Sequence, residues 1–146
     1  MHPDPTAATA PVRTAGTCTL ALAAVLLALA TAGGAFGAHA LRNRLAPPRL
    51  ELWDTAVRYQ FFQSLGLFGI GLLLRSLERG GTAAHAAAAL RRAAVLNAAG
   101  VLLFSGSLYA LALGAPRAFG LLTPLGGAAW IAAWLLCAFG AWRSQG

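Results

Sequence analysis

Apolar residues fall into four long stretches, and most charged residues gather in the short segments between them. The stretches cover approximately residues 17–38, 56–74, 93–113 and 124–142. A helix needs about 20 apolar residues to cross the hydrocarbon core of a bilayer, which is about 30 Å thick. Each stretch meets or approaches that length. The pattern therefore predicts an all-α integral membrane protein whose four transmembrane helices form one bundle.

Proline and glycine mark the expected helix ends. Pro47 and Pro48 interrupt the chain before the second stretch, and Gly-Ala-Pro at residues 114–116 follows the third. Thr123 and Pro124 have the order of an N-cap followed by the first helical residue, so they predict the start of the fourth helix. These signals agree with the ends of the apolar stretches.

The chain before the first apolar stretch differs in composition from the rest. Residues 1–14 contain three prolines and are expected to form a disordered N-terminal tail, which leaves residues 15–143 as a single membrane domain. The first stretch also resembles a signal peptide, because Arg13 precedes it and Ala-His-Ala follows it at residues 38–40. It is longer than a usual signal-peptide core, and three further stretches follow. This favours a transmembrane helix.

Composition supports lipid as the solvent. Of 146 residues, 58% are hydrophobic and 10% are charged, whereas an average soluble domain is about 45–50% apolar and about 25% charged. A water-soluble monomer of this size is therefore excluded. Cys18 and Cys137 are too few for a disulfide framework or a metal site, and both are interpreted as packing residues.

All eleven basic residues are arginines, and the net charge is +7. Ten of them flank the apolar stretches, as cations do in membrane proteins, so we expect the lipid bilayer and not nucleic acid as the partner. Four spans place both termini on one side of the membrane. That side holds six arginines, and the other holds four, or five if Arg58 reaches it. The positive-inside rule therefore favours cytoplasmic termini.

Small residues recur at intervals of four along two of the stretches. These positions are Ala24, Ala28, Ala32, Gly33 and Gly37, followed by Ala129, Ala133, Cys137 and Ala141. Small side chains let helix backbones approach closely in lipid, so the pattern predicts tight packing within the bundle. An interface between copies of the chain is the alternative interpretation.

Polar residues near the first and third loops are expected to lie in the same half of the bilayer. They form the candidate site: His39, Asp54, Arg58, Tyr59, Gln60, Gln63, Ser105, Ser107, Tyr109 and Thr123. Gln63 and Ser105 have matching expected depths, and Asp54 and Arg58, four residues apart, can form an ion pair. Asn97 is expected near the opposite face.

These residues can hold the helices together by hydrogen bonds, or they can bind a small polar ligand or a lipid headgroup. No catalytic, metal-binding or cofactor-binding residues are predicted. His39 and His85 are expected at opposite faces, which argues against a haem held by two histidines. The absence of acidic residues after Glu78 argues against a proton-coupled transporter. Replacing Arg58 by leucine is expected to weaken the bundle or a binding role.

Four strings together suggest a family. They are GAFGAHAL at residues 34–41, TAVRYQFFQSLGL at 55–67, FSGSLYALAL at 104–113 and TPLGGAAWIAAW at 123–134. In this order they resemble the YgdD/YwdK-like family of small bacterial membrane proteins (domain of unknown function 423), over residues 15–143. The resemblance implies four transmembrane helices in the plasma (inner) membrane, no cofactor and no established activity. The family pattern has a histidine where this chain has Gln63, and glutamine does not titrate near neutral pH.

The sequence thus predicts an integral protein of the bacterial cytoplasmic membrane with a structural or accessory role and no enzymatic activity. The alternative is a small oligomeric transporter or channel-like protein that uses the candidate site to bind a polar solute or a lipid headgroup.

Overall fold

The structure is a computed structural model, and it describes residues 14–80 and 84–143. All elements in these two ranges are helical. Of the predicted disordered tail, only Thr14 belongs to them. Its hydroxyl accepts a hydrogen bond from the backbone N–H of Thr17 and caps helix α1, Ala15–Phe36. A π-helical segment, η1 (Gly37–Leu41), extends this helix toward the first loop.

Helix α2 covers Pro47–Gly80 and is the longest in the molecule, with 34 residues. The two prolines begin this helix, because a proline is tolerated in the first turn, where its missing N–H would have no helical partner. The helix therefore starts nine residues before the apolar stretch at residues 56–74 begins. At about 1.5 Å per residue, this difference moves the loop end of the helix by about 13 Å.

Three consecutive segments form the next rod: α3 (Ala84–Gly100), the π-helical η2 (Val101–Ser105) and α4 (Gly106–Ala112). The rod ends at Ala112, two residues before Gly114, which has a φ of 102° in the left-handed region that favours glycine. The predicted stop at residues 114–116 is confirmed.

The last rod begins with a 3-10 turn, η3 (Arg117–Leu121), and continues as α5 (Leu122–Arg143). Thr123 therefore lies inside the helix, and its predicted role as an N-cap is wrong. Its hydroxyl instead lies 2.8 Å from the hydroxyl of Ser107 on α4.

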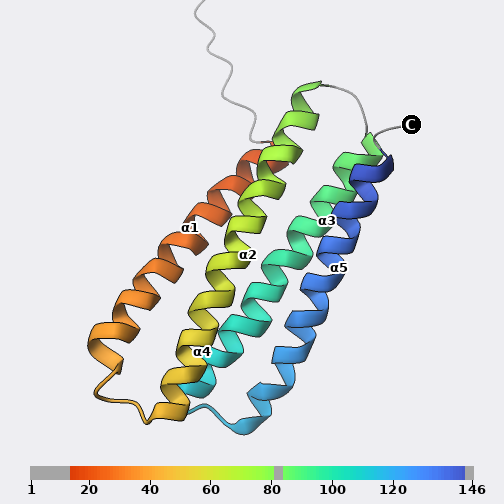
Figure 1. Ribbon diagram of the computed structural model, residues 1–146. Coiled ribbons are helices and arrows are strands. Elements are labelled where there is room, and N and C mark those ends of the chain that lie inside the picture. The colour runs from red at the N-terminus through yellow and green to blue at the C-terminus, as the bar shows by residue number, and fades with distance from the viewer. Residues whose placement is uncertain (1–13, 81–83, 144–146) are drawn as a thin grey trace, which may run out of the picture.

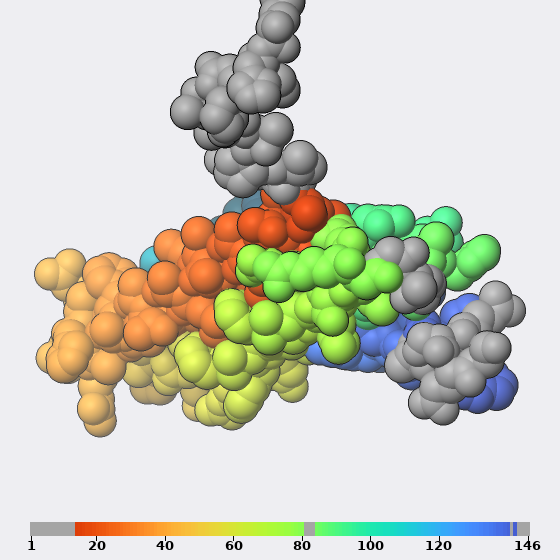
Figure 2. Space-filling model, turned by 90° about the horizontal axis from the view of Figure 1, so that it is seen from above, coloured from red at the N-terminus to blue at the C-terminus, as the bar shows by residue number. Residues whose placement is uncertain are grey.

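The four rods lie side by side and alternate in direction (Figure 1). α1 packs on α2, α3 packs on α5, and α2 also contacts the α3–α4 rod. Seen from above, the α1–α2 pair lies beside the α3–α5 pair, so the bundle is broader than it is deep (Figure 2). We call the end where α1 begins and α5 finishes the terminal end, and the opposite end the loop end.

Three helical stretches are long and apolar enough to cross a membrane: Ala15–Leu41, Ala84–Ala112 and Arg117–Gly140. Large apolar side chains on their surfaces, such as Val25, Leu102 and Ile131, are exposed. Helix α2 is not among the three stretches. It lies between α1 and α3 in the bundle (Figure 1) and carries the buried polar residues Gln60 and Ser64.

Candidate functional site in the bundle interior

A set of polar side chains meets halfway along the bundle. Nδ2 of Asn97 donates a hydrogen bond to Oε1 of Gln63 over 3.1 Å, and Nε1 of Trp134 donates to the same oxygen over 3.2 Å. We call Gln63, Asn97 and Trp134 the central polar group. Its three members come from α2, α3 and α5, so one glutamine oxygen connects three helices.

Gln63 therefore bonds Asn97. The prediction that Gln63 and Ser105 lie at the same depth and can meet is wrong. The physical reason is the early start of α2 at Pro47, which places Gln63 near the middle of its helix. Asn97 also lies near the middle of the stretch Ala84–Ala112, so Gln63 and Asn97 lie at the same level along the bundle axis. The expectation that Asn97 lies apart from the other polar residues, near the opposite face, is also wrong, because α3 begins at Ala84, well before the apolar stretch counted from residue 93.

Aromatic rings cover the central polar group on its loop side. Nε1 of Trp130 donates to the backbone oxygen of Asn97 over 3.1 Å. Its ring lies parallel to that of Tyr59, with centroids 5.8 Å apart, and 4.7 Å from that of Phe104. Gly100 makes room for Trp130, because a Cβ at this position would lie 2.4 Å from the indole. Tyr59 thus acts here through its ring.

Another contact joins α1 and α2 near the loop end. Nε1 of Trp53 donates to the backbone oxygen of Gly33 over 2.9 Å, and the Trp53 ring lies 4.6 Å from the ring of Tyr109. A Cβ at Gly37 would lie 2.8 Å from the indole. Trp53 is buried in the bundle, where a tryptophan with a satisfied N–H packs well.

Two further candidate contacts also connect neighbouring helices. Nε2 of Gln60 donates to the backbone oxygen of Leu26 on α1 over 2.9 Å. Ser107 is buried, and its hydroxyl bonds the Phe104 backbone oxygen and the Thr123 hydroxyl. Both contacts agree with polar residues that hold the bundle together.

The candidate residues do not form one cluster. His39, Asp54 and Arg58 are exposed, and within the described residues no ion pair joins Asp54 to Arg58, so that predicted pair is wrong. Both side chains lie on the outer face of α2, where water or headgroups can solvate each separately. Ser105 is buried, and its hydroxyl has no hydrogen-bond partner among the residues that the structure describes.

Two other buried oxygens share this property with Ser105. They are Oγ of Ser64 and Oδ1 of Asn97, both on fully buried side chains. An unpaired polar atom in a buried site is costly, so each of these three oxygens can accept a further donor.

Glu78 forms a contact that the sequence analysis missed. Its carboxylate accepts a hydrogen bond from the backbone N–H of Gly16 over 3.1 Å, at the start of α1. A helix N-terminus favours a negative charge because its first N–H groups have no helical partner. The sequence contained a usable signal, because Glu78 lies shortly after the second apolar stretch. Since α1 and α2 are antiparallel, the end of α2 lies beside the start of α1.

The chemical capacity of the site is hydrogen bonding. Within residues 14–80 and 84–143, no group of three or more histidine, cysteine, aspartate or glutamate residues could hold a metal ion. Comparison with known proteins complements this description. A family described as protein of unknown function (DUF423) matches residues 33–127.

The chain belongs to this family. It is 38% identical to the UPF0382 membrane protein YwdK of Bacillus subtilis over 115 residues, which are 79% of this chain and 88% of YwdK. It is 37% identical to the UPF0382 membrane protein SSP2132 of Staphylococcus saprophyticus, over 84% of this chain and 94% of the relative. It is 34% identical to the UPF0382 inner membrane protein YgdD of Escherichia coli, over 75% of this chain and 78% of YgdD. No solved structure matches.

These relatives confirm the resemblance on which the sequence analysis relied. They are called membrane and inner membrane proteins, and this chain has three helices that can span a bilayer. The chain is therefore a multi-pass integral protein of the bacterial plasma (inner) membrane. No activity is known for the family, whose description is that of a protein of unknown function.

Proposed function

We propose that this protein is a four-span structural or accessory protein of the membrane, without enzymatic activity, whose polar side chains hold its helices together. The proposal includes α2 as the fourth span. Its 34 residues are long enough to cross a bilayer, and it lies alongside α1 and α3, which can both span one. Its buried polar residues face other helices, so its lower hydropathy does not prevent it from crossing.

One observation carries this proposal. Three polar side chains of the candidate site form hydrogen bonds to neighbouring helices: Gln60 to α1, Gln63 to α3 and α5, and Ser107 to α5. A ligand site requires polar groups that converge on a shared cavity, whereas helix–helix stabilisation requires polar groups that bond one another. These three side chains bond groups of other helices, as helix–helix stabilisation requires.

Access of water to the bundle centre tests the proposal. We suggest replacing Cys18 and Cys137 by alanine and then placing a single cysteine at Gln63 or at the exposed Asp54. A charged, membrane-impermeant maleimide should label Asp54→Cys and leave Gln63→Cys unlabelled in open membrane fragments that expose both faces. Labelling of Gln63→Cys at a similar rate would reveal a hydrated path and would overturn the structural role.

The small oligomeric transporter or channel-like protein is the second candidate. The observation that favours it is the set of unpaired buried oxygens on Ser64, Asn97 and Ser105, which could accept donors from a polar solute. The exposed positions Ala24 and Ala28 on α1 offer a small-residue face to a second copy. Chemical cross-linking that yields only monomers, together with an unlabelled Gln63→Cys, would exclude this candidate.

The proposed orientation places both termini in the cytoplasm. Its support is the excess of arginines near the terminal end, which includes Arg75, Arg79, Arg91 and Arg92. Paired C-terminal fusions to a reporter that is active only in the cytoplasm and to one that is active only in the periplasm test it. Activity of the cytoplasmic reporter alone is expected, and activity of the periplasmic reporter alone would reverse the orientation.

A further inference from the structure

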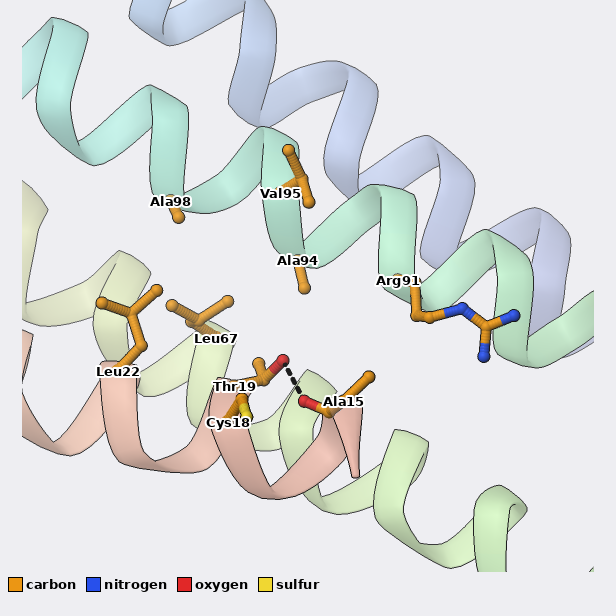
Figure 3. A pocket seen from close by; sticks show the side chains of 9 residues that line it. All are labelled: Ala15, Cys18, Thr19, Leu22, Leu67, Arg91, Ala94, Val95 and Ala98. Atoms are coloured by element: carbon orange, nitrogen blue, oxygen red, sulfur yellow. Dashed lines mark hydrogen bonds between the residues drawn. The ribbon is translucent and has the colours of Figure 1, made fainter. Parts of the chain in front are cut away.

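Two apolar grooves lie on either side of α3 near the terminal end. The first, of about 410 Å³, lies between α1 and α3, with Cys18 and Leu22 on one wall, Ala98 on the other and Leu67 of α2 between them (Figure 3). The second, of about 450 Å³, lies between α3 and α5 and is lined by Leu96 and Leu136. Arg91 and Val95 line both grooves.

Arginines stand at one end of these grooves. Arg91 belongs to both, and Arg92 lines the groove between α3 and α5. Both are exposed, and no carboxylate among the described residues lies within ion-pair distance of either guanidinium. Two adjacent cations thus stand beside apolar grooves without a counter-charge from the described part of the chain.

The direction of α3 lets these two side chains extend toward the terminal end of the bundle. Side chains on a helix tilt toward its N-terminus, and α3 begins at the terminal end. Figure 3 shows the Arg91 side chain extending away from Ala94 and Ala98, beyond the apolar part of the groove. Seven residues separate Arg91 from Ala98, so the groove continues for about 10 Å from the cation toward the bilayer centre.

We propose that one anionic phospholipid binds across α3, with its phosphate on Arg91 and Arg92 and one acyl chain in each groove. Two grooves that share a cation fit a molecule with two apolar chains and one anionic head. The forked guanidinium suits a phosphate, and basic pockets at the surface ends of transmembrane helices attract anionic lipids. The site is distinct from the central polar group and does not depend on the proposed structural role.

Retention of lipid by the full chain provides the test. The protein would be purified in detergent, mixed with equal amounts of phosphatidylglycerol and phosphatidylcholine, and its bound lipid counted by native mass spectrometry. One phosphatidylglycerol should be retained in preference to phosphatidylcholine. Arg91→Gln should weaken that binding about fivefold, the effect of about one arginine at a membrane surface. Arg91→Lys should lose less of the preference than Arg91→Gln, because it keeps the charge but not the forked donor geometry.

A matched control separates a site from general electrostatic attraction. Arg79 is exposed at the same end of the bundle and lines neither groove, so Arg79→Gln should change phosphatidylglycerol binding less than twofold. Equal losses in Arg91→Gln and Arg79→Gln would overturn the proposal, and so would equal retention of the two lipids by the unmodified chain.

The groove itself is tested by filling it. Cys18 is exposed and lines the groove between α1 and α3, whereas Ala21 is exposed on the same helix and does not line the groove. Cys18→Trp should reduce phosphatidylglycerol binding several-fold, and Ala21→Trp should leave it unchanged. Cys18→Leu is the smaller replacement if the tryptophan variant does not fold. Unchanged binding in a folded Cys18 variant would contradict the assignment of an acyl chain to this groove.

Discussion

The two sides of α2 form different kinds of hydrogen bond with the neighbouring helices. Toward α1, side chains of α2 bond backbone groups: Trp53 bonds Gly33, Gln60 bonds Leu26 and Glu78 bonds Gly16. Toward α3 and α5, side chains bond side chains, as in the central polar group. In lipid, apolar side chains gain little free energy from packing together, because the solvent is itself apolar. The bundle therefore uses both kinds of hydrogen bond to hold its helices together.

The sequence of α1 explains the difference. Two of its hydroxyl groups bond within the helix, Thr19 to the Ala15 oxygen and Thr31 to the Leu27 oxygen. Backbone groups of α1 therefore serve as partners for α2. They are accessible because glycines bring the helices close: a Cβ at Gly16 would lie 2.5 Å from the backbone nitrogen of Arg75. The α3 and α5 helices carry amide, indole and hydroxyl groups and can use side chains.

Close backbone approach should contribute most to stability, both between α1 and α2 and between α5 and η2. Between α5 and η2, a Cβ at Gly126 would lie 2.5 Å from the backbone nitrogen of Phe104. Gly126→Ala should therefore lower the free energy of unfolding by about 1–3 kcal/mol, the usual effect of overpacking. Unfolding in mixed micelles by titration with dodecyl sulfate measures it.

The neighbouring glycine is the control for this substitution. A Cβ at Gly127 would meet no atom of the described residues within 4 Å, so Gly127→Ala should not destabilise the protein. Equal destabilisation by the two variants would show that the close contact between α5 and η2 does not limit stability.

The side-chain-to-backbone bonds should rank next. Trp53→Phe keeps an aromatic ring beside Tyr109 and removes the donor to the Gly33 oxygen. It should lower the free energy of unfolding by about 1 kcal/mol, the usual net value of one hydrogen bond. The exposed Trp142 provides a matched Trp→Phe control that should be neutral. A neutral Trp53→Phe would remove this bond from the account of the α1–α2 interface.

The hydroxyl pair between α4 and α5 should contribute less. Ser107→Ala removes a bond to Thr123 of 2.8 Å and should lower the free energy of unfolding by about 0.6 kcal/mol, the average for such bonds between membrane helices. Ser76 is exposed, so Ser76→Ala is the comparison variant. If Ser107→Ala lowers the free energy of unfolding more than Gly126→Ala does, side-chain hydrogen bonding contributes more than close backbone packing to the contact of α5 with the α3–α4 rod.

Arg58→Leu should have the smallest effect. The sequence suggested that this change weakens the bundle, but Arg58 is exposed and has no ion-pair partner within the described residues. Surface substitutions of this kind stay within about 0.5 kcal/mol. Unfolding of the variant in mixed micelles checks this value, and a large loss of stability would show that Arg58 has a partner in the membrane.

The order and approximate extent of the helices could be predicted, because apolar length and helix-ending residues are local properties. The stop before Gly114 is one example. The register of the helices relative to one another along the bundle axis was predicted less well. Apolar residues mark where a chain can enter lipid, but α2 continues to Pro47, beyond its apolar part. Depths counted from residue 56 therefore matched Gln63 with Ser105, whereas its partner is Asn97.

The site was predicted in kind but not in its partners. Gln60, Gln63, Ser107 and Thr123 do bond across helices. The donor roles of Trp134 and Trp130 could not be predicted, because indoles also occur at membrane surfaces and in packed cores. The π-helical segments Gly37–Leu41 and Val101–Ser105 were also missed, since the same residues are compatible with an ordinary α-helix.

The most direct test of the account is a double-mutant cycle between Gln63 and Asn97. The free energies of unfolding of Gln63→Leu, Asn97→Leu and the double variant would be compared with that of the unmodified chain. Side chains that bond over 3.1 Å should show a coupling energy of about 0.6–2 kcal/mol. Strictly additive effects of the two substitutions would contradict the central claim that this polar pair fastens α2 to α3.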